Sequence, residues 1–323
     1  MIVTQVFYLV VIGGLLFVEF VRETTPGAIP MPRWLERAWR YRSPAIHFCF
    51  GSLMNLYSLF FLMSASLFSS IVFAVMLFGA VILNELPFIR RRGLDVKVAF
   101  FVLCVFCFWS LLVPIVLGHV GRLTFALSCA GTVAVLAILV DRLRRRVGWT
   151  SVRRRLLAPG FSVIAGFVAF YLVGWIPPVP VAAKTLGVFH GVERTGDEYQ
   201  LTYQPAPWKP WRSDDREFIG EPGDRLYVFF AIYSPARFAD TVFVHLSRHD
   251  AGAGWLTTDR LPIAITGGRR TGFRGFAVKQ NYTGGDWRVK VETSDGREIA
   301  RLHFTVRKRE ADPARVLVTR AYK

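Results

Sequence analysis

The chain has 323 residues, of which 53% are hydrophobic and 20% charged, with a net charge of +17 and a mean hydropathy of +0.36. Soluble domains average roughly 45–50% apolar and about 25% charged residues, so a single soluble globule is excluded. Disordered low-complexity sequence is also excluded, because 28 phenylalanines are present and no tract is repetitive. The composition indicates a membrane-embedded part joined to a soluble part.

The two parts meet near Ile176. Residues 1–176 contain 17 Lys and Arg against 6 Asp and Glu, whereas residues 177–323 contain 23 against 17, so their net charges are +11 and +6. In the first part, long apolar runs alternate with basic clusters, which is typical of repeated membrane crossing. We predict six transmembrane helices, at Ile2–Phe20, Ile46–Met63, Leu67–Phe88, Val98–Gly118, Leu123–Val140 and Gly160–Ile176.

The loops between these spans predict their orientation. Arginine and lysine fill the first, third and fifth loops and are nearly absent from the second and fourth. Because cytoplasmic loops carry the excess of basic residues, we expect the N-terminus and all residues after Ile176 to lie outside the cytoplasm. The first span lacks a basic n-region and a small-residue cleavage site, so we expect it to be retained.

The part after Ile176 reads as β structure. Apolar and polar residues alternate in Trp287–Glu292 and in Ala300–Arg307, and Ser294-Asp295-Gly296 between them is a strong turn signal, so a hairpin is predicted. Other candidate strands are Lys184–Glu193, Tyr199–Tyr203, Tyr227–Ile232, Thr241–Leu246 and Leu261–Thr266, with an irregular excursion at Pro205–Gly223.

These short strands predict an all-β, immunoglobulin-like antiparallel sandwich. The expected organisation is a transmembrane domain at 1–176, a linker at 177–183, the sandwich at 184–310 and a tail at 311–323. The sandwich contains no cysteine, so it folds without disulfides, and its length suffices for an unaided core.

Two segments carry a family resemblance. Val242-Phe243-Val244-His245, Gly268-Arg269-Arg270-Thr271, Lys279, Gly285-Asp286-Trp287-Arg288-Val289 and Phe304-Thr305-Val306 resemble the bacterial domain of unknown function twenty-nine fourteen. Arg42-Ser43-Pro44-Ala45-Ile46-His47-Phe48 and Leu83-Asn84-Glu85-Leu86 are similar to a partner family, domain of unknown function fifty-nine twenty-four. The resemblance implies an inner-membrane protein of Gram-negative bacteria and implies no activity.

Four polar residues within the spans are candidate intramembrane site residues: His47, Asn55, Asn84 and Glu85. His47 and Asn55 are about two turns apart and are expected on one face of their helix. Such groups mark functional paths or form interhelical hydrogen bonds. Glu19, Asn84 and Glu85 lie near the cytoplasmic ends, where ion pairing with adjacent arginines is the simpler interpretation. No acid is expected at mid-bilayer, which argues against a proton-coupled transporter.

Outside the membrane, the Gly-rich segment 267–275 presents Arg269, Arg270 and Arg274, and Lys279 follows on the next strand. Arginine forks bind carboxylates and phosphates bidentately, so this loop could hold an acidic glycan, a lipid headgroup or a protein partner. A solvated basic hairpin is the alternative. His245 and Trp255 are added as candidate ligand-binding residues, and Trp208 and Trp211 could stack on a ligand, rest on the membrane or cap the core.

No catalytic motif is recognisable. Cys104 and Cys107 have the spacing of a redox or metal motif but lack its structural context, so apolar packing is the simpler interpretation. His245, His249 and Asp250 lack an obvious further ligand, so neither a metal nor a cofactor is predicted. Nucleic acid is not expected as a partner, because the cytoplasmic loops account for most of the basic surplus.

Two functions remain open. The first is a non-catalytic membrane protein, such as an accessory subunit, whose exported β-domain binds a protein or an anionic envelope ligand. The second is a multispan enzyme or small transporter acting on lipid or envelope precursors. The second would require His47, Asn55, Asn84 and Glu85 to meet at a cavity.

Overall fold

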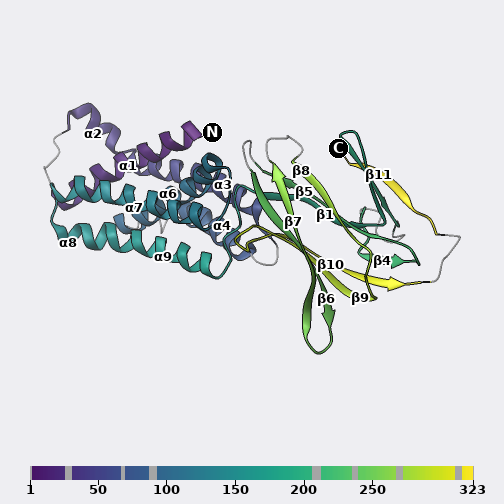
Figure 1. The fold of residues 1–323 in the computed structure, drawn as a ribbon. Coiled ribbons are helices and arrows are strands. Elements are labelled where there is room, and N and C mark those ends of the chain that lie inside the picture. The colour runs from purple at the N-terminus through teal and green to yellow at the C-terminus, as the bar shows by residue number, and fades with distance from the viewer. Residues whose placement is uncertain are drawn as a thin grey trace. The chain divides into compact units, whose positions relative to one another are not determined.

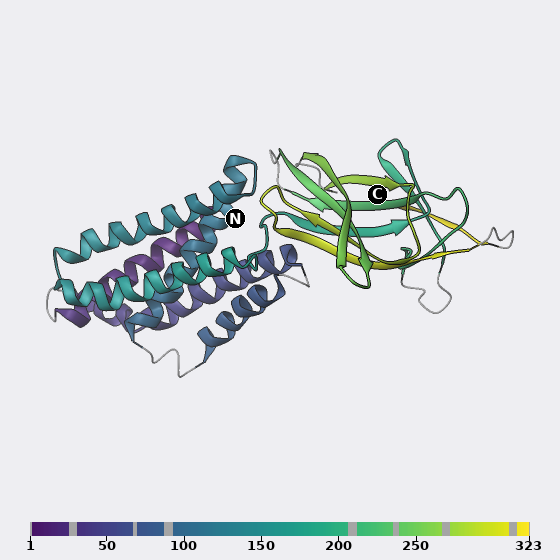
Figure 2. The same cartoon turned by 60° about the horizontal axis from the view of Figure 1, so that its bottom comes forward.

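The computed structural model describes residues 2–25, 31–66, 70–86, 93–205, 212–234, 239–266, 272–309 and 315–322. They form two compact units, a helical unit and a β unit (Figures 1 and 2). The helical unit comprises Met1–Met63, Ser69–Leu117 and Gly121–Val179, and the β unit comprises Pro180–Lys323 together with the short segments Ser64–Phe68 and Gly118–Val120.

Long apolar helices make up the helical unit. Their bounds are α1 Ile2–Thr24, α2 Arg33–Trp39, α3 Arg42–Ser64, α4 Ile71–Glu85, α6 Leu94–Leu117, α7 Arg122–Arg144, α8 Trp149–Val152, the π-helix η1 Arg153–Leu157, and α9 Ala158–Leu172. Aromatic side chains fill the interior, where Phe73 and Phe106 both pack against Phe167. The last helix ends at a glycine cap: Gly174 has φ +77°, and the Trp175 N–H donates to the Phe170 carbonyl (2.9 Å).

Five helices are long and apolar enough to cross a membrane: α1, α3, α6, α7 and the continuous helix Trp149–Leu172. The chain is therefore a multi-pass membrane protein. The third predicted span is shorter than expected, because α4 has 15 residues, about 22 Å at 1.5 Å per residue. The last span begins earlier than predicted and ends at Leu172 rather than Ile176, because the glycine cap stops the helix.

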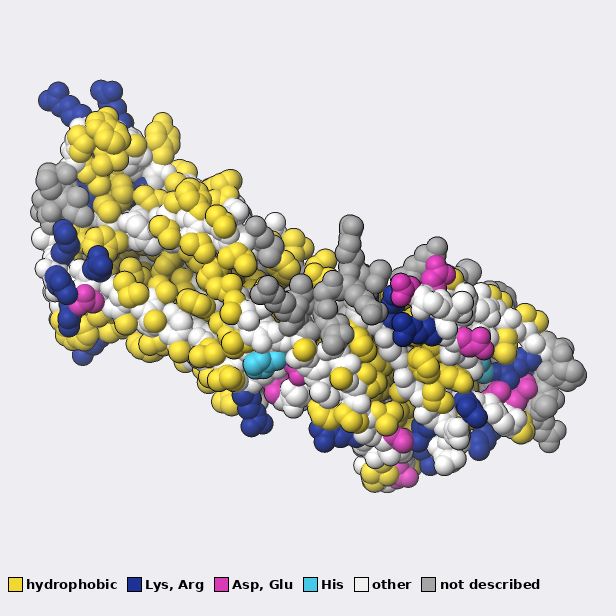
Figure 3. All heavy atoms as spheres, turned by 45° about the horizontal axis from the view of Figure 1, so that its top comes forward, with side chains coloured by type: hydrophobic (Ala, Val, Ile, Leu, Met, Phe, Trp, Pro, Cys, Tyr) yellow, Lys and Arg dark blue, Asp and Glu magenta, His cyan; other side chains and the backbone are white. Residues whose placement is uncertain are grey.

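The outer surface of this unit is apolar. Figure 3 shows hydrophobic side chains covering the visible flank of the helices, with lysine and arginine gathered at one end. Val3 is 81% exposed and Leu172 79%, although both are on membrane-length helices. Outward-facing aliphatic side chains of this kind suit a hydrocarbon solvent rather than water.

One end of the helical unit is basic. At this end Arg155 of η1 pairs with Glu23 of α1 (3.3 Å), and the Thr25 hydroxyl donates to the Arg146 carbonyl (3.4 Å). The last residues of α1, the residues following α7 and η1 therefore meet. Two of the predicted basic loops, which are far apart in the sequence, thus begin at the same end of the bundle.

The β unit contains eleven strands within its described residues. They are β1 Ala182–Phe189, β2 Gly191–Thr195, β3 Glu198–Tyr203, β4 Glu217–Gly220, β5 Leu226–Tyr233, β6 Ala239–Asp250, β7 Gly254–Thr266, β8 Phe273–Lys279, β9 Gly285–Glu292, β10 Glu298–Lys308 and β11 Val318–Tyr322. The predicted hairpin is confirmed as β9 and β10, which pair antiparallel around a turn where Gly296 has φ +84°.

The strands form three sheets. The five-stranded sheet has the order β4-β10-β9-β6-β7, the central sheet β1-β5-β8 and the third sheet β11-β3-β2. Val228 and Phe230 of β5 join a core with the five-stranded sheet, whereas Phe229 and Ala231 join a core with the third sheet. Because side chains alternate along a strand, this central strand is buried on both faces and reads as a continuous apolar run.

The described strands correct several details of the sequence interpretation. Lys184–Glu193 is two strands, β1 and β2, in different sheets. The excursion contains β4, which pairs parallel with β10, so the sandwich is not wholly antiparallel. The segment predicted as a tail contains β11, which pairs antiparallel with β3. β8, Phe273–Lys279, begins inside the predicted Gly-rich segment and is not among the candidate strands either. β4 and β11 are short, and the partners of all three strands are distant in the sequence.

Candidate functional site

A buried ion pair joins three helices near the basic end of the helical unit. Lys97 Nζ of α6 lies 2.6 Å from Glu19 Oε1 of α1, and Arg42 Nε of α3 lies 3.4 Å from the same oxygen. The Glu19 side chain is 3% exposed. The acid is therefore paired at the boundary as expected, but its partners are Lys97 and Arg42 of two other helices rather than the adjacent arginines.

Three of the four intramembrane candidates lie together. His47 Nδ1 is 2.8 Å from Asn84 Oδ1, and Asn84 Nδ2 donates to the His47 carbonyl (3.1 Å) and to Glu85 Oε1 (3.3 Å). A Cβ on Gly51 would lie 3.4 Å from Glu85 Oε1, so a small residue of α3 borders this cluster. Reciprocal bonds between α3 and α4 match the hydrogen-bonding alternative and fix the relative position of the two helices.

Asn55 does not join this cluster. Its side chain is exposed, because eight residues at 3.6 per turn place it roughly 80° around the helix from His47. The pockets described in the helical unit are lined by none of the four candidates. Among the described residues, the geometry therefore shows an interhelical clamp between α3 and α4.

Only part of the predicted arginine loop lies within the described residues. Arg269 and Arg270 lie outside the described residues, as do Trp208 and Trp211. Arg274 and Lys279 are on opposite faces of β8. The Arg274 guanidinium lies 5.6 Å from the Tyr199 ring of the third sheet, whereas Lys279 Nζ lies 2.5 Å from Asp259 and 5.5 Å from the Trp287 ring. Side chains an odd number of residues apart on a strand point to opposite faces. Arg274 and Lys279 are five residues apart, so they do not form one surface.

His245 and Trp255 are on the outward face of the five-stranded sheet. We call this surface the charged face and define it by His245, Trp255, Arg260, Arg288, Lys290, Glu292, Glu298, Arg301 and His303. In one row across the sheet, Arg260, His245, Lys290 and Arg301 lie on successive strands, because His245 opposes both Arg260 and Lys290 and Lys290 opposes Arg301. Four basic side chains thus stand side by side.

Two carboxylates partly neutralise this row. Glu292 pairs with Lys290 and with His245 (3.2 Å), and Glu298 pairs with Arg301. Arg260 lies 4.1 Å from the Phe243 ring, and no ion pair of Arg260 or Arg288 is found within the described ranges. Four Lys and Arg therefore face two Glu, which leaves a cationic surplus on the charged face.

On the other side of the charged face, several side chains contact the Trp255 ring. The Arg288 guanidinium lies 4.6 Å from its ring, and the His303 ring stacks on it at 5.4 Å. His249 contacts the same ring edge-on, at 5.1 Å. Asp250 accepts hydrogen bonds from the backbone N–H groups of Gly252 and Ala253 (both 3.0 Å), so it closes the β6–β7 turn. An aromatic ring bordered by cations suits a planar or anionic ligand.

The pKa values of both histidines of this face are lowered. Burial lowers the pKa of His245, and Arg260 and Lys290 lower it further, against the opposing effect of Glu292. Burial and the nearby Arg301 and Arg288 lower the pKa of His303. The charge of the face at neutral pH therefore comes from arginine and lysine.

Sequence reasoning missed a buried His–Asp pair in the β unit. His190 Nδ1 lies 2.7 Å from Asp215 Oδ2, and His190 Nε2 donates to the Ile219 carbonyl (3.1 Å). The Gln204 N–H donates to Asp215 Oδ1 (2.8 Å). Burial raises the pKa of Asp215, although the His190 hydrogen bond acts in the opposite direction. The pair ties the excursion to the β1–β2 connection, and no local sequence signal reveals a partner 25 residues away.

Cysteines and acidic clusters supply no metal site in the part of the chain that the structure describes. Cys104 and Cys107 are buried within α6, and Cys49 and Cys129 are also free thiols. No group of three or more His, Cys, Asp or Glu side chains that could hold a metal ion occurs among the described residues.

Comparisons with known proteins match the β unit. A family described as "Protein of unknown function (DUF2914)" matches residues 239–306, which run from β6 into β10. The segment includes all residues that define the charged face. No curated protein matches the chain.

Similarities to solved structures are distant. The immunoglobulin-like protein of Pseudomonas aeruginosa is 13% identical, with 39% of this chain and 96% of that chain covered and a TM-score of 0.25. The β-glucosidase of Listeria innocua in complex with glucose is 15% identical, with 34% and 16% covered and a TM-score of 0.21. The GH3 β-glucosidase of Bifidobacterium adolescentis is 13% identical, with 42% and 19% covered and a TM-score of 0.20. This chain thus spans less than a fifth of either β-glucosidase.

Proposed function

We propose that this protein is a non-catalytic membrane protein that uses the charged face of its β unit to bind an anionic envelope ligand or an acidic protein partner. It would act as an accessory subunit or an envelope-associated module of the bacterial inner membrane, with an immunoglobulin-like β unit in the periplasm. The cationic surplus on the charged face is the observation that carries this proposal. The resemblance of the membrane half to domain of unknown function fifty-nine twenty-four is part of the same proposal.

The helices before and after α4 support six crossings. Arg42 near the start of α3 and Lys97 near the start of α6 both contact Glu19, so both helices begin at the same end of the bundle. α4 connects the far end of α3 to the start of α6. It must therefore return across the same distance, and we propose that it is the sixth span despite its 15 residues.

An even number of crossings puts the N-terminus and the β unit on the same side of the membrane. The basic end of the bundle would then face the cytoplasm, in line with the excess of basic residues in cytoplasmic loops. Labelling single cysteines in intact cells tests this orientation. Ser294→Cys in the exposed β9–β10 turn should react with an impermeant maleimide, and Arg153→Cys in η1 should react only after lysis.

Two properties of the charged face favour binding. Arg260 and Arg288 lie over aromatic rings rather than in ion pairs, so they keep donors available for carboxylates or phosphates. The sheet fixes the spacing of the row across four strands, which reduces the entropy lost when a ligand is bound.

Crosslinked co-purification of the tagged full-length protein from native membranes tests the proposed function. The variant Arg260→Gln/Arg288→Gln should lose a defined protein or acidic glycan that the wild type retains. The matched control is Arg194→Gln/Arg320→Gln, which removes two exposed arginines from the third sheet. Equal recovery from all three proteins, or equal loss in both variants, would reject the charged face as the binding site.

A further inference from the structure

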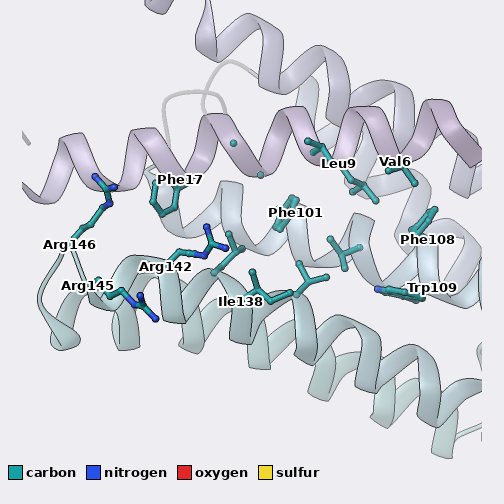
Figure 4. A pocket seen from close by; sticks show the side chains of 16 residues that line it. Val6, Leu9, Phe17, Phe101, Phe108, Trp109, Ile138, Arg142, Arg145 and Arg146 are labelled. Atoms are coloured by element: carbon teal, nitrogen blue, oxygen red, sulfur yellow. The ribbon is translucent and has the colours of Figure 1, made fainter. Parts of the chain in front are cut away.

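A large groove runs along the helical unit between α1, α6 and α7 (Figure 4). Its volume is about 1150 Å³, above the ~300–1,000 Å³ usual for small-molecule sites. Apolar side chains line most of it, including Val6 and Phe17 of α1, Phe101 and Trp109 of α6, and Ile138 of α7. The groove lies entirely within the helical unit.

Glycines shape the walls of this groove. Gly13 and Gly14 of α1 both line it, and a Cβ on Gly14 would meet no atom within 4 Å, so this position opens directly into the groove. At the far end, the Trp109 ring lies against Gly131 of α7, where a Cβ would come within 2.7 Å of the indole. Small residues therefore open the space along α1 and let the indole lie flat at one end.

Arginines line the opposite end of the groove. Arg142 lies in the last turn of α7, and Arg145 and Arg146 follow the end of the helix. Figure 4 shows Arg145 and Arg146 beyond Phe17 and Arg142 about level with it. Arg145 pairs with Asp141 (3.0 Å). Arg142 and Arg146 have no acidic partner within the described ranges, and both side chains are exposed. An apolar groove thus ends at two cations without counter-charge.

Each wall of the groove is about as long as one bilayer leaflet is deep. The lining residues of α1 run from Val6 to Phe17, and those of α7 and the two residues after it run from Val135 to Arg146, so each set covers twelve residues and rises roughly 16 Å. Half of a hydrocarbon core of roughly 30 Å has nearly the same depth. Val10 and Ile138 on the rim are 67% and 60% exposed, so the groove is open to the surface that faces lipid.

We propose that this groove binds one acidic glycerophospholipid from the leaflet on the arginine side. An acyl chain lies along α1, α6 and α7 between Phe17 and Trp109, and the headgroup phosphate is held by Arg142 and Arg146. Basic pockets between transmembrane helices recognise anionic headgroups through charge and hydrogen bonding. The site differs from the charged face in both location and ligand, so either proposal can fail without the other.

Native mass spectrometry of the full-length protein tests the proposal. The protein is released from nanodiscs that contain equal amounts of dioleoyl-phosphatidylglycerol and dioleoyl-phosphatidylcholine, which share their acyl chains and differ in net charge. The wild type should retain one phosphatidylglycerol in preference to phosphatidylcholine. Arg142→Gln/Arg146→Gln should reduce this preference about 30-fold, since each cation near the membrane surface contributes roughly fivefold.

Filling the groove is an independent second test. Gly14→Leu should expel the lipid while both arginines remain. The matched controls are Gly166→Leu on α9, where a side chain also meets open space, and Arg153→Gln/Arg154→Gln in η1 at the same basic end. Both controls should retain phosphatidylglycerol at the wild-type level.

Three outcomes would overturn the proposal: equal retention of the two lipids by the wild type, unchanged phosphatidylglycerol in both groove variants, or equal loss in the η1 control. The first would leave only unselective lipid at the groove, the second would mean that phosphatidylglycerol binds elsewhere, and the third would mean that the whole basic end acts without a specific site. Thermal unfolding of each variant, matched to the wild type, separates loss of lipid from loss of fold.

Discussion

Large hydrophobic side chains face outward as well as inward on the helical unit, whereas those of the β unit lie mainly inside. Val116 of α6 is 72% exposed, whereas Trp287 and Val289 of β9 are buried between sheets. Charges follow the opposite rule. The helical unit holds most of its charges at one end or in the buried Glu19–Lys97 pair, and the β unit spreads many of its charges over an outward sheet face. The two units are built for different solvents, and in each unit the cations without counter-charge are where we propose that a ligand binds.

The largest expected effect comes from breaking the buried pair of the helical unit. Glu19→Ala leaves the Lys97 ammonium buried without its carboxylate and should lower the free energy of unfolding by about 3–5 kcal/mol. Chemical unfolding in detergent micelles measures it. Glu19→Gln/Lys97→Met, which removes both charges, should recover most of the loss. Wild-type stability of Glu19→Ala would mean that the pair contributes nothing.

The corresponding break in the β unit is His190→Ala. It leaves the Asp215 carboxyl buried without its main partner and should cost about 3 kcal/mol. Asp214→Asn is the matched control, because the neighbouring carboxyl pairs with the partly exposed Arg216 and should matter by less than about 1 kcal/mol. Equal effects of the two substitutions on unfolding would contradict the structural role of the His190–Asp215 pair.

A smaller effect distinguishes two asparagines within the spans. Asn84→Leu removes the hydrogen bonds to His47 and should destabilise the helical unit by about 1–2 kcal/mol. Asn55→Leu replaces an exposed amide with an aliphatic side chain and should be neutral or stabilising. Thermal unfolding of the two variants in the same detergent checks this order, and a reversed order would refute the clamp.

The smallest effect is a pH dependence of the β unit. The pKa of His245 and of His303 is lowered on folding, so the unfolded chain takes up protons first as the pH falls. Their contribution to stability is therefore complete above about pH 6.5 and is lost below it, toward the folded-state pKa values. In His245→Gln/His303→Gln, the denaturation midpoint should depend less on pH between pH 7.5 and 5.5 than it does in the wild type. Parallel profiles would contradict this assignment.

Hydropathy and alternation predict much of this architecture, because both depend on the nearest residues in the chain. The apolar runs locate the long helices, and alternation locates the β9–β10 hairpin. β4 and β11 escape prediction because they are short and pair with distant strands. Where α4 begins and ends depends on the positions of the neighbouring helices α3 and α6, which the sequence alone does not give.

Candidate residues were predicted less completely than the fold. His47 of α3 meets Asn84 and Glu85 of α4 because these residues lie where the two helices contact each other, whereas Asn55 points away from this contact. The cationic row of the charged face depends on the register between β7, β6, β9 and β10. Register is set by the whole sheet, so a single strand such as Trp287–Glu292 shows only that its charged residues face outward.

Site-specific photocrosslinking in intact cells tests the central proposal most directly. A benzoylphenylalanine in place of His249, beside Trp255 on the β unit, should give one defined adduct that weakens when Arg260 and Arg288 are changed to Gln. The same probe in place of Arg194 on β2 should give none. Equal adducts at both positions, or an adduct indifferent to the two arginines, would contradict binding at the charged face.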